Sequence, residues 1–199
     1  EPCPPRINID LFRRYAEDLV DLYAVDAVII TCSTMNRSAG AVRETLKPRG
    51  VPVVQIDEAM MEEAVARGGR ILVVATHGPT VKSTQDLLRE TAARMGKTVD
   101  FAGATVEEAF ELLGAGDIAG HNRVVADAIR RAVGDGGQSA GGAASGIRTI
   151  VLAQLSMSVF KFTWPDGAAE REVGAPVLTS GETGFRQARE VLLAGGRRT

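Results

Sequence analysis

The chain has 199 residues, of which 45% are hydrophobic, so it can bury a substantial core as one large domain or as two small ones. The net charge at pH 7 is −2 without runs of like charge, which argues against nucleic acid and membrane surfaces as partners. No apolar run has the length of a membrane span, and two cysteines, Cys3 and Cys32, are too few for a disulfide framework, so we expect a cytoplasmic protein.

Apolar residues recur with helical and strand periods in alternation along most of the chain. Strands are expected at 27–31, 53–56, 71–75, 98–102, 150–153 and 177–179, and helices at 10–23, 36–46, 58–66, 81–95, 105–114, 117–133 and 182–193. Residues 134–146 are nearly all Gly, Ala and Ser and read as a flexible surface loop, while 156–164 are open to a short helix or an extended segment. Strands that alternate with helices predict an α/β fold with parallel sheets.

The most informative strand is 27–31, which leads into the polar cluster Thr31-Cys32-Ser33-Thr34. Its run of Val and Ile predicts burial on both faces, as in a parallel sheet. Cys32 then lies where a strand ends and a helix begins, and ligands of open α/β sheets bind outside such ends. Backbone N–H groups and a helix dipole favour the thiolate form of a thiol in that place. The alternative is that Cys32 is a small buried hydrophobe without chemistry.

The pattern around Cys32 returns near the other end of the chain. Residues 149–157 align with 27–35 without a gap, so that Gln154 falls on Cys32. Residues 175–182 align in the same way with 51–58, and the two pairs keep their order. This order predicts an internal duplication, although any two parallel βα units share some likeness.

A second polar strand end, Thr76-His77-Gly78-Pro79-Thr80, follows the strand expected at 71–75. Thr76 and Thr80 can cap the next helix, bind a carboxylate, or do both, because the two tasks use the same helix-end geometry. His77 is either a second proton carrier or a hydrogen-bond donor to the substrate, or else a turn histidine in water. His121 is expected on a solvated helix face. No nucleotide-binding glycine motif and no metal-ligand spacing is present in the sequence, so no metal site is predicted.

Three stretches together, 28–34, 73–80 and 151–154, resemble the aspartate/glutamate racemase superfamily, which includes amino-acid and hydantoin racemases, maleate isomerase and arylmalonate decarboxylase. The resemblance implies two pseudo-symmetric parallel-sheet α/β halves with the site in the cleft between them. We place the first half at 1–80 together with 180–199 and the second at 81–179. The strand and helix that open the family's fold are not found before Glu1, so we expect the first half to lack its N-terminal strand.

The resemblance also implies cofactor-independent proton transfer at the carbon next to a carboxylate of a small acid or amino acid. Cys32 would be the acid/base; His77, whose charge changes near neutral pH, is the other candidate catalytic residue, on chemical grounds rather than on the resemblance. Gln154 stands where two-base members have their second cysteine, and an amide has no proton to exchange near neutral pH. The residues expected to bind the substrate are Ser33, Thr34, Thr76, Thr80 and Gln154.

These expectations leave the reaction open. A racemase/isomerase-type enzyme is the first hypothesis, and a one-base decarboxylase-like enzyme or a non-catalytic carboxylate-binding protein is the alternative. The expected partner is a small carboxylate or amino acid, without cofactor, metal, nucleic acid or membrane. The sequence leaves the state of assembly open, a homodimer or a higher homo-oligomer included.

Overall fold

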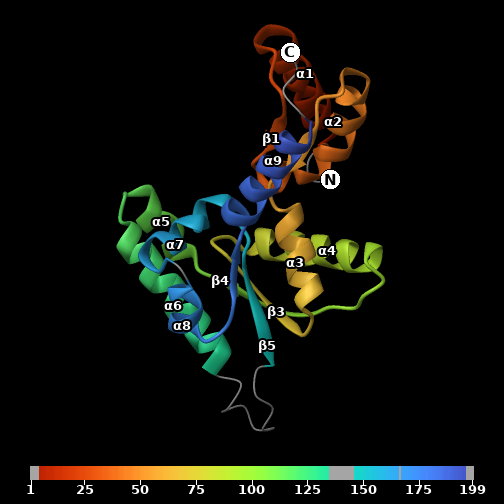
Figure 1. Ribbon diagram of the computed structural model, residues 1–199. Helices are drawn as coiled ribbons and strands as arrows, with labels where there is room; N and C mark the ends of the chain where they lie inside the picture. The colour runs from red at the N-terminus through yellow and green to blue at the C-terminus, as the bar shows by residue number, and fades with distance from the viewer. Residues whose placement is uncertain (1–4, 135–145, 166, 196–199) are drawn as a thin grey trace. The chain divides into compact units, whose positions relative to one another are not determined.

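The computed structural model describes residues 5–134, 146–165 and 167–195 (Figure 1). The loop predicted for 134–146 therefore lies almost wholly outside the described residues. Contacts divide the chain into two compact units: unit 1 consists of Glu1–Ala59 and Gly181–Thr199, and unit 2 is Met60–Ser180. Each unit is described by itself below.

Unit 1 is built on a short parallel pair of strands, in which Val28 of one strand lies opposite Val53 of the other. Val28, Ile30 and Val53 pack on one side of the pair in a core that includes residues of α1 and α2. Gly184 of α9 approaches the chain at Ile56, where a Cβ on the glycine would lie 2.1 Å from the Ile56 carbonyl oxygen. The elements of unit 1 are α1 (Arg6–Tyr23), β1 (Val28–Ile30), η1 (Ser33–Ser38), α2 (Ala39–Leu46), η2 (Lys47–Arg49), β2 (Val53–Gln55), the start of α3 (Glu58–Arg67), and α9 (Ser180–Gly195), which begins at the last residue of unit 2.

Unit 2 is a four-stranded parallel sheet in the order β4-β3-β5-β6. Alternate residues of β3 point to opposite faces, as the pleat of a strand requires. Ile71 and Val73 pack with α3 and α4, whereas Leu72 and Val74 pack with residues of α5, α6, α7 and α8. Besides most of α3, the elements are β3 (Arg70–Ala75), α4 (Gly78–Arg94), β4 (Asp100–Thr105), α5 (Glu107–Gly114), α6 (Ile118–Gly134), β5 (Ile147–Leu152), η4 (Leu155–Val159), α7 (Phe160–Thr163), α8 (Ala168–Val173) and β6 (Val177–Thr179).

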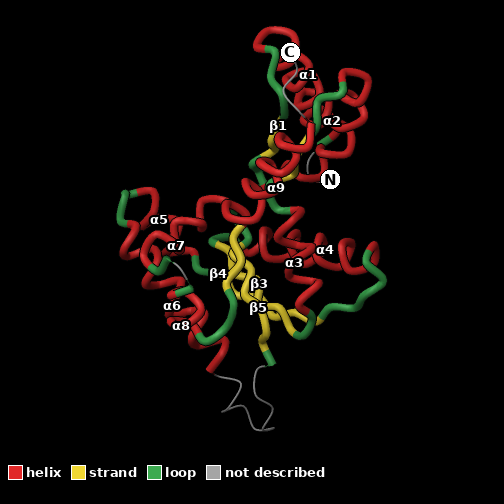
Figure 2. Tube along the Cα trace, in the orientation of Figure 1, coloured by secondary structure: helices red, strands yellow, loops and turns green. Residues whose placement is uncertain are grey.

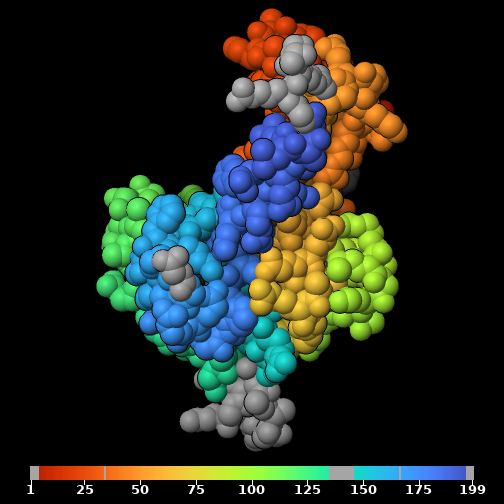
Figure 3. Space-filling view, viewed as in Figure 1, coloured from red at the N-terminus to blue at the C-terminus, as the bar shows by residue number. Residues whose placement is uncertain are grey.

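Helices thus cover both faces of the unit 2 sheet, with α3 and α4 on one flank and α5 to α8 on the other (Figure 2). In the space-filling view their side chains hide most of the sheet, and the teal start of β5 emerges at the lower edge of the unit (Figure 3). The buried parallel strands predicted from the runs of Val and Ile are confirmed here, since Ile71 to Ala75 are all fully buried.

The α/β fold with parallel sheets is confirmed, but several sequence boundaries were wrong. Residues 33–38, half of them expected to start a helix, form a 3-10 segment, and residues 156–164 form η4 and α7 rather than an extended segment. The helix α8 at Ala168–Val173 was not predicted. β3 pairs with β4 and β5, so residues 60–80 belong to unit 2 and not to the first half, which was drawn at 1–80. Strand pairing between distant segments decides that boundary, and local periodicity carries no information about it.

None of the helices in the described ranges is long and apolar enough to serve as a membrane span.

Candidate functional site

The carboxyl end of β1 presents Cys32 to solvent. Cys32 has an extended backbone and stands directly before η1, where its carbonyl oxygen accepts a hydrogen bond of 2.9 Å from the Met35 backbone N–H. Its thiol is free and exposed. This placement rules out the alternative of a small buried hydrophobe and leaves a thiol that a ligand can reach.

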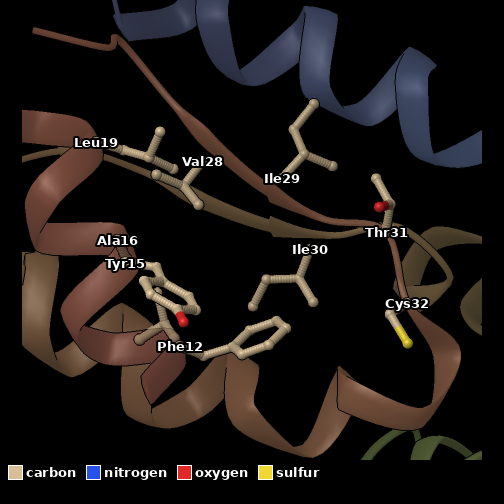
Figure 4. A pocket seen from close by; sticks show the side chains of 10 residues that line it. Phe12, Tyr15, Ala16, Leu19, Val28, Ile29, Ile30, Thr31 and Cys32 are labelled. Atoms are coloured by element: carbon tan, nitrogen blue, oxygen red, sulfur yellow. The ribbon is translucent and has the colours of Figure 1, made fainter. Parts of the chain in front are cut away.

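An apolar pocket of about 170 Å³ runs along β1 as far as Cys32 (Figure 4). Phe12 and Ile30 lie on one side of the strand in this view, and Ile29 and Thr31 project to the other side. The predicted neighbour Ser33 is partly exposed at the start of η1. Thr34 also lies in η1, but its side chain is outside the described part of the structure.

The carboxyl end of β2 carries a buried acid that the sequence reasoning missed. Asp57 is 4% exposed and accepts hydrogen bonds from two side-chain amides, Asn36 Nδ2 and Gln55 Nε2, the latter at 2.9 Å. Burial raises the pKa of Asp57 to about 6, although the hydrogen bonds from Gln55, its own backbone N–H and Asn36 act in the opposite direction. Its signal in the sequence was the one used for Cys32, a polar residue just after a buried strand.

In unit 2 the residues that end β3 and β5 are joined directly. Thr76 is buried, and both its backbone N–H and its hydroxyl donate hydrogen bonds to Gln154 Oε1, at 2.7 and 3.0 Å. β3 continues to β4 on one side of the sheet while β5 and β6 lie on the other, so the order of strands reverses between β3 and β5. Parallel sheets bind ligands outside the carboxyl ends of strands at such a reversal. The Gln154 oxygen thus accepts from both donors of Thr76 at this reversal.

His77 and Thr80 follow at the start of α4. His77 is exposed, and its ring packs on Phe110 of α5 with centroids 4.8 Å apart and planes inclined by 56°. Thr80 is partly buried and donates its backbone N–H to the His77 carbonyl oxygen. The first turn of α4 contains no acidic residue, and no side chain caps it, so of the two tasks considered for Thr76 and Thr80 capping is not seen and the positive end of this helix dipole is not neutralised from within.

The two strand ends repeat each other in detail within their own units. Val28 pairs with Val53 and Ile150 with Val177, which is the register that the alignment of 27–35 with 149–157 requires. Gln154, like Cys32, is an extended residue before a 3-10 segment, and its carbonyl oxygen accepts a bond of 3.0 Å from Met157 N–H. The repeat predicted from the sequence is therefore present in strand pairing, in register and in the turn that follows.

Two further residues differ from expectation or lie out of view. His121 is fully buried on α6 instead of lying on a solvated face, and its Nδ1 is 2.7 Å from Asn122 Oδ1. Cys3 lies outside the described residues. In the described ranges no three His, Cys, Asp or Glu residues gather as metal ligands.

A known protein family matches this sequence. The sequence model of the family described as Asp/Glu/hydantoin racemase matches residues 14–188, which is most of the chain. The chain belongs to this family. The resemblance carried by Cys32, Thr76 and Gln154 is thus confirmed at the level of the family.

Solved racemases share the fold of this Asp/Glu/hydantoin racemase family member at low sequence identity. Glutamate racemase from Bacillus anthracis is 16% identical with a TM-score of 0.59, and the match covers 98% of this chain and 69% of that one. Allantoin racemase from Klebsiella pneumoniae is 19% identical with a TM-score of 0.59, covering 94% and 66%. Escherichia coli glutamate racemase is 19% identical with a TM-score of 0.54, covering 93% and 65%.

The chain therefore spans about two thirds of the length of these solved racemases. No curated protein matches the sequence at the level of significance applied.

Proposed function

We propose that this family member transfers a proton at the carbon next to a carboxylate of a small acid or amino acid, with Cys32 as the acid/base. The observation that carries the proposal is the exposed thiol at the carboxyl end of β1, before η1. A thiolate there removes the α-proton and returns a proton to the carbanion. The negative charge that develops on the substrate carboxylate needs preorganised hydrogen-bond donors.

Within unit 2, the β3 and β5 ends carry a donor pair of this kind. Thr76 directs an N–H and a hydroxyl at one oxygen, and that oxygen now belongs to Gln154. A carboxylate bound within unit 2 would take this place when the Gln154 side chain turns aside, and the amide nitrogen of Gln154 would then donate to it. In unit 2 the first turn of α4 adds backbone N–H groups, and in unit 1 the Ser33 hydroxyl follows Cys32 directly in the chain.

The repeat argues for chemistry on one face of the α-carbon. Gln154 holds the position that matches Cys32, and an amide does not exchange protons near pH 7. Unless His77 supplies the second proton, the enzyme would remove and return the proton on the same side, as a one-base isomerase or decarboxylase does. A carboxylate-binding protein without catalysis is the second candidate, favoured by the amide of Gln154 at the position that matches Cys32, which has no proton to exchange.

Exchange in D₂O tests this proposal. The protein is incubated with aspartate, glutamate, hydantoins and substituted malonates, and loss of the α-proton signal is followed by NMR. We expect Cys32→Ala to reduce exchange by a factor of about 10² or more, whereas Cys3→Ser, the matched control, keeps it. Unchanged exchange in Cys32→Ala would remove Cys32 from the mechanism, and binding without exchange in the unmodified protein would favour the binding protein.

The configuration of the exchanged substrate separates the one-base from the two-base mechanism. We expect deuterium to enter with retained configuration, and Gln154→Cys to add racemisation. Racemisation by the unmodified protein that is lost in His77→Ala would instead identify His77 as the second proton carrier.

A further inference from the structure

The buried carboxyl group of Asp57 is connected to the turn that carries Cys32. Asp57 follows β2, the strand that pairs with β1, and its Oδ2 accepts the hydrogen bond from Asn36 Nδ2. Asn36 lies in η1, four residues after Cys32. The carboxylate at the end of β2 thus binds the side chain of Asn36, which follows the end of the neighbouring strand β1.

The η1 turn is itself a connected set of hydrogen bonds. Its first bond runs from Met35 N–H to the Cys32 carbonyl oxygen, and Ser38 Oγ donates to the Met35 carbonyl oxygen at 2.5 Å. Asn36 is 6% exposed, and its Oδ1 has no hydrogen-bond partner among the described residues. The orientation of the Asn36 amide is therefore set by its donation to Asp57, because turning the amide over would direct its oxygen at the carboxylate.

Among the described residues, no cation compensates the charge of Asp57. The charged group that acts on it is Glu58, which repels it and is itself paired with Arg43 Nη2 at 2.5 Å. The ionised form is held by neutral donors alone, from Gln55, Asn36 and the backbone. Burying a carboxylate without a positive partner costs more free energy than burying an apolar side chain of similar volume at the same place. Buried groups of this kind concentrate at functional sites.

We propose that Asp57 is a positioning residue for Cys32, because its carboxylate holds Asn36 and, through Asn36, the η1 turn that presents the thiol. The role in catalysis rests on the proposed function of Cys32, but the effect on the thiol does not. Asp57 itself touches no reacting atom in this scheme.

The test exchanges the two partners of the hydrogen bond. Asn36→Asp sets two carboxylates against each other, and Asp57→Asn replaces the charged acceptor of the Asn36 N–H group with a neutral amide. In the double variant Asn36→Asp/Asp57→Asn, the new amide at position 57 donates to the carboxylate at 36 and still accepts from Gln55. Each is made in a Cys3→Ser background so that Cys32 is the single thiol, and the rate of alkylation by iodoacetamide is measured above pH 7, where Asp57 is ionised.

We expect each single variant to change the alkylation rate of Cys32, and the pH at which it reaches half its maximum, with a change in rate of about fivefold or more. The double variant should return both quantities to within about twofold of the parent. Glu58→Gln is the matched control, because it removes a neighbouring carboxylate without touching Asn36, and it should leave the rate within about twofold.

Folded single variants with the parent's rate and pH profile would overturn the proposal, as would a double variant that restores neither. If Asn36→Asp fails to fold, Asp57→Asn still decides the matter, because it is isosteric and removes a buried charge. The D₂O exchange assay is run on the same variants. Alkylation that responds as expected in a protein without any exchange activity would leave the positioning role standing and remove only the proposed enzyme function.

Discussion

The ionised carboxylate of Asp57 lowers the stability of the folded protein at neutral pH, whereas we propose that it positions Cys32. Burial raises its pKa from 3.8 to about 6, so the folded protein binds a proton that the unfolded chain releases between these two values. The stability that Asp57 contributes is fully present below pH 3.8 and is lost as the pH rises through about 6. Two pKa units correspond to roughly 3 kcal/mol, which is an upper bound for this effect.

Asp57→Asn should therefore stabilise the protein at neutral pH. We expect its advantage in free energy of unfolding over the parent to grow by about 1–3 kcal/mol between pH 4 and pH 7.5, because the neutral amide needs no proton. Urea unfolding followed by circular dichroism at several pH values measures the difference. Asp26→Asn, at an exposed position of the same unit, is the control and should show a much smaller trend. A difference that is independent of pH would contradict the assigned burial cost.

At the scale of elements, the repeat consists of two matching strand–turn motifs, one in unit 1 and one in unit 2. Each motif consists of a strand, an extended residue and a 3-10 segment. Its strand pairs with the next strand along the chain, β1 with β2 and β5 with β6, in the same register. At the position where unit 1 has the thiol of Cys32, unit 2 has the amide of Gln154. This arrangement is the structural basis for expecting one-sided proton transfer.

A second consequence at this scale concerns α9. Gly184 leaves no space for a methyl group, because a Cβ there would lie 2.1 Å from the Ile56 carbonyl oxygen and 2.7 Å from Ile56 Cδ1. We expect Gly184→Ala to destabilise the protein by about 1–3 kcal/mol, since backbone must shift to accept it.

Gly40→Ala is the matched control for Gly184→Ala. Gly40 lies in α2 of the same unit with nothing within 4 Å of an added Cβ, so alanine should stabilise the helix there by about 0.5–1 kcal/mol. Both values are read from urea unfolding. Equal effects of the two substitutions would mean that α9 does not approach β2 as closely as described.

At the scale of the whole molecule, the two units differ in how the chain builds them. Unit 2 is one continuous segment with a sheet covered on both faces, whereas unit 1 is assembled from two segments separated by unit 2. A continuous segment such as unit 2 can fold alone, because its hydrophobic core needs no residues from a distant part of the chain.

We accordingly expect a fragment of residues 58–180 to fold by itself, while a fragment of residues 1–59, which lacks α9, should not. Trp164 is the single tryptophan of the chain and packs on Phe160 in unit 2, so its fluorescence reports this fold directly. The longer fragment should show a cooperative urea transition with a red shift of emission. A gradual change without a transition would show that unit 2 depends on the remainder of the chain.

The sequence alone determined the order of the strands, their burial in parallel sheets, the strand-end position of Cys32 and the repeat that aligns it with Gln154. These features are local or periodic, and a run of Val and Ile or a gapless alignment can be read without knowing what it packs against. The family followed from the same stretches.

The tertiary structure decided what joins residues far apart in the chain. It placed β3 between β4 and β5, so the boundary drawn at residue 80 moved to residue 60. It joined Thr76 to Gln154, 78 positions apart, and buried Asp57 against Asn36, 21 positions away. It also buried His121, which a mid-helix polar context suggested was solvated. The physical reason is that burial and hydrogen-bond partnership depend on which elements pack together, and those pairings are made by the sheet order rather than by local sequence.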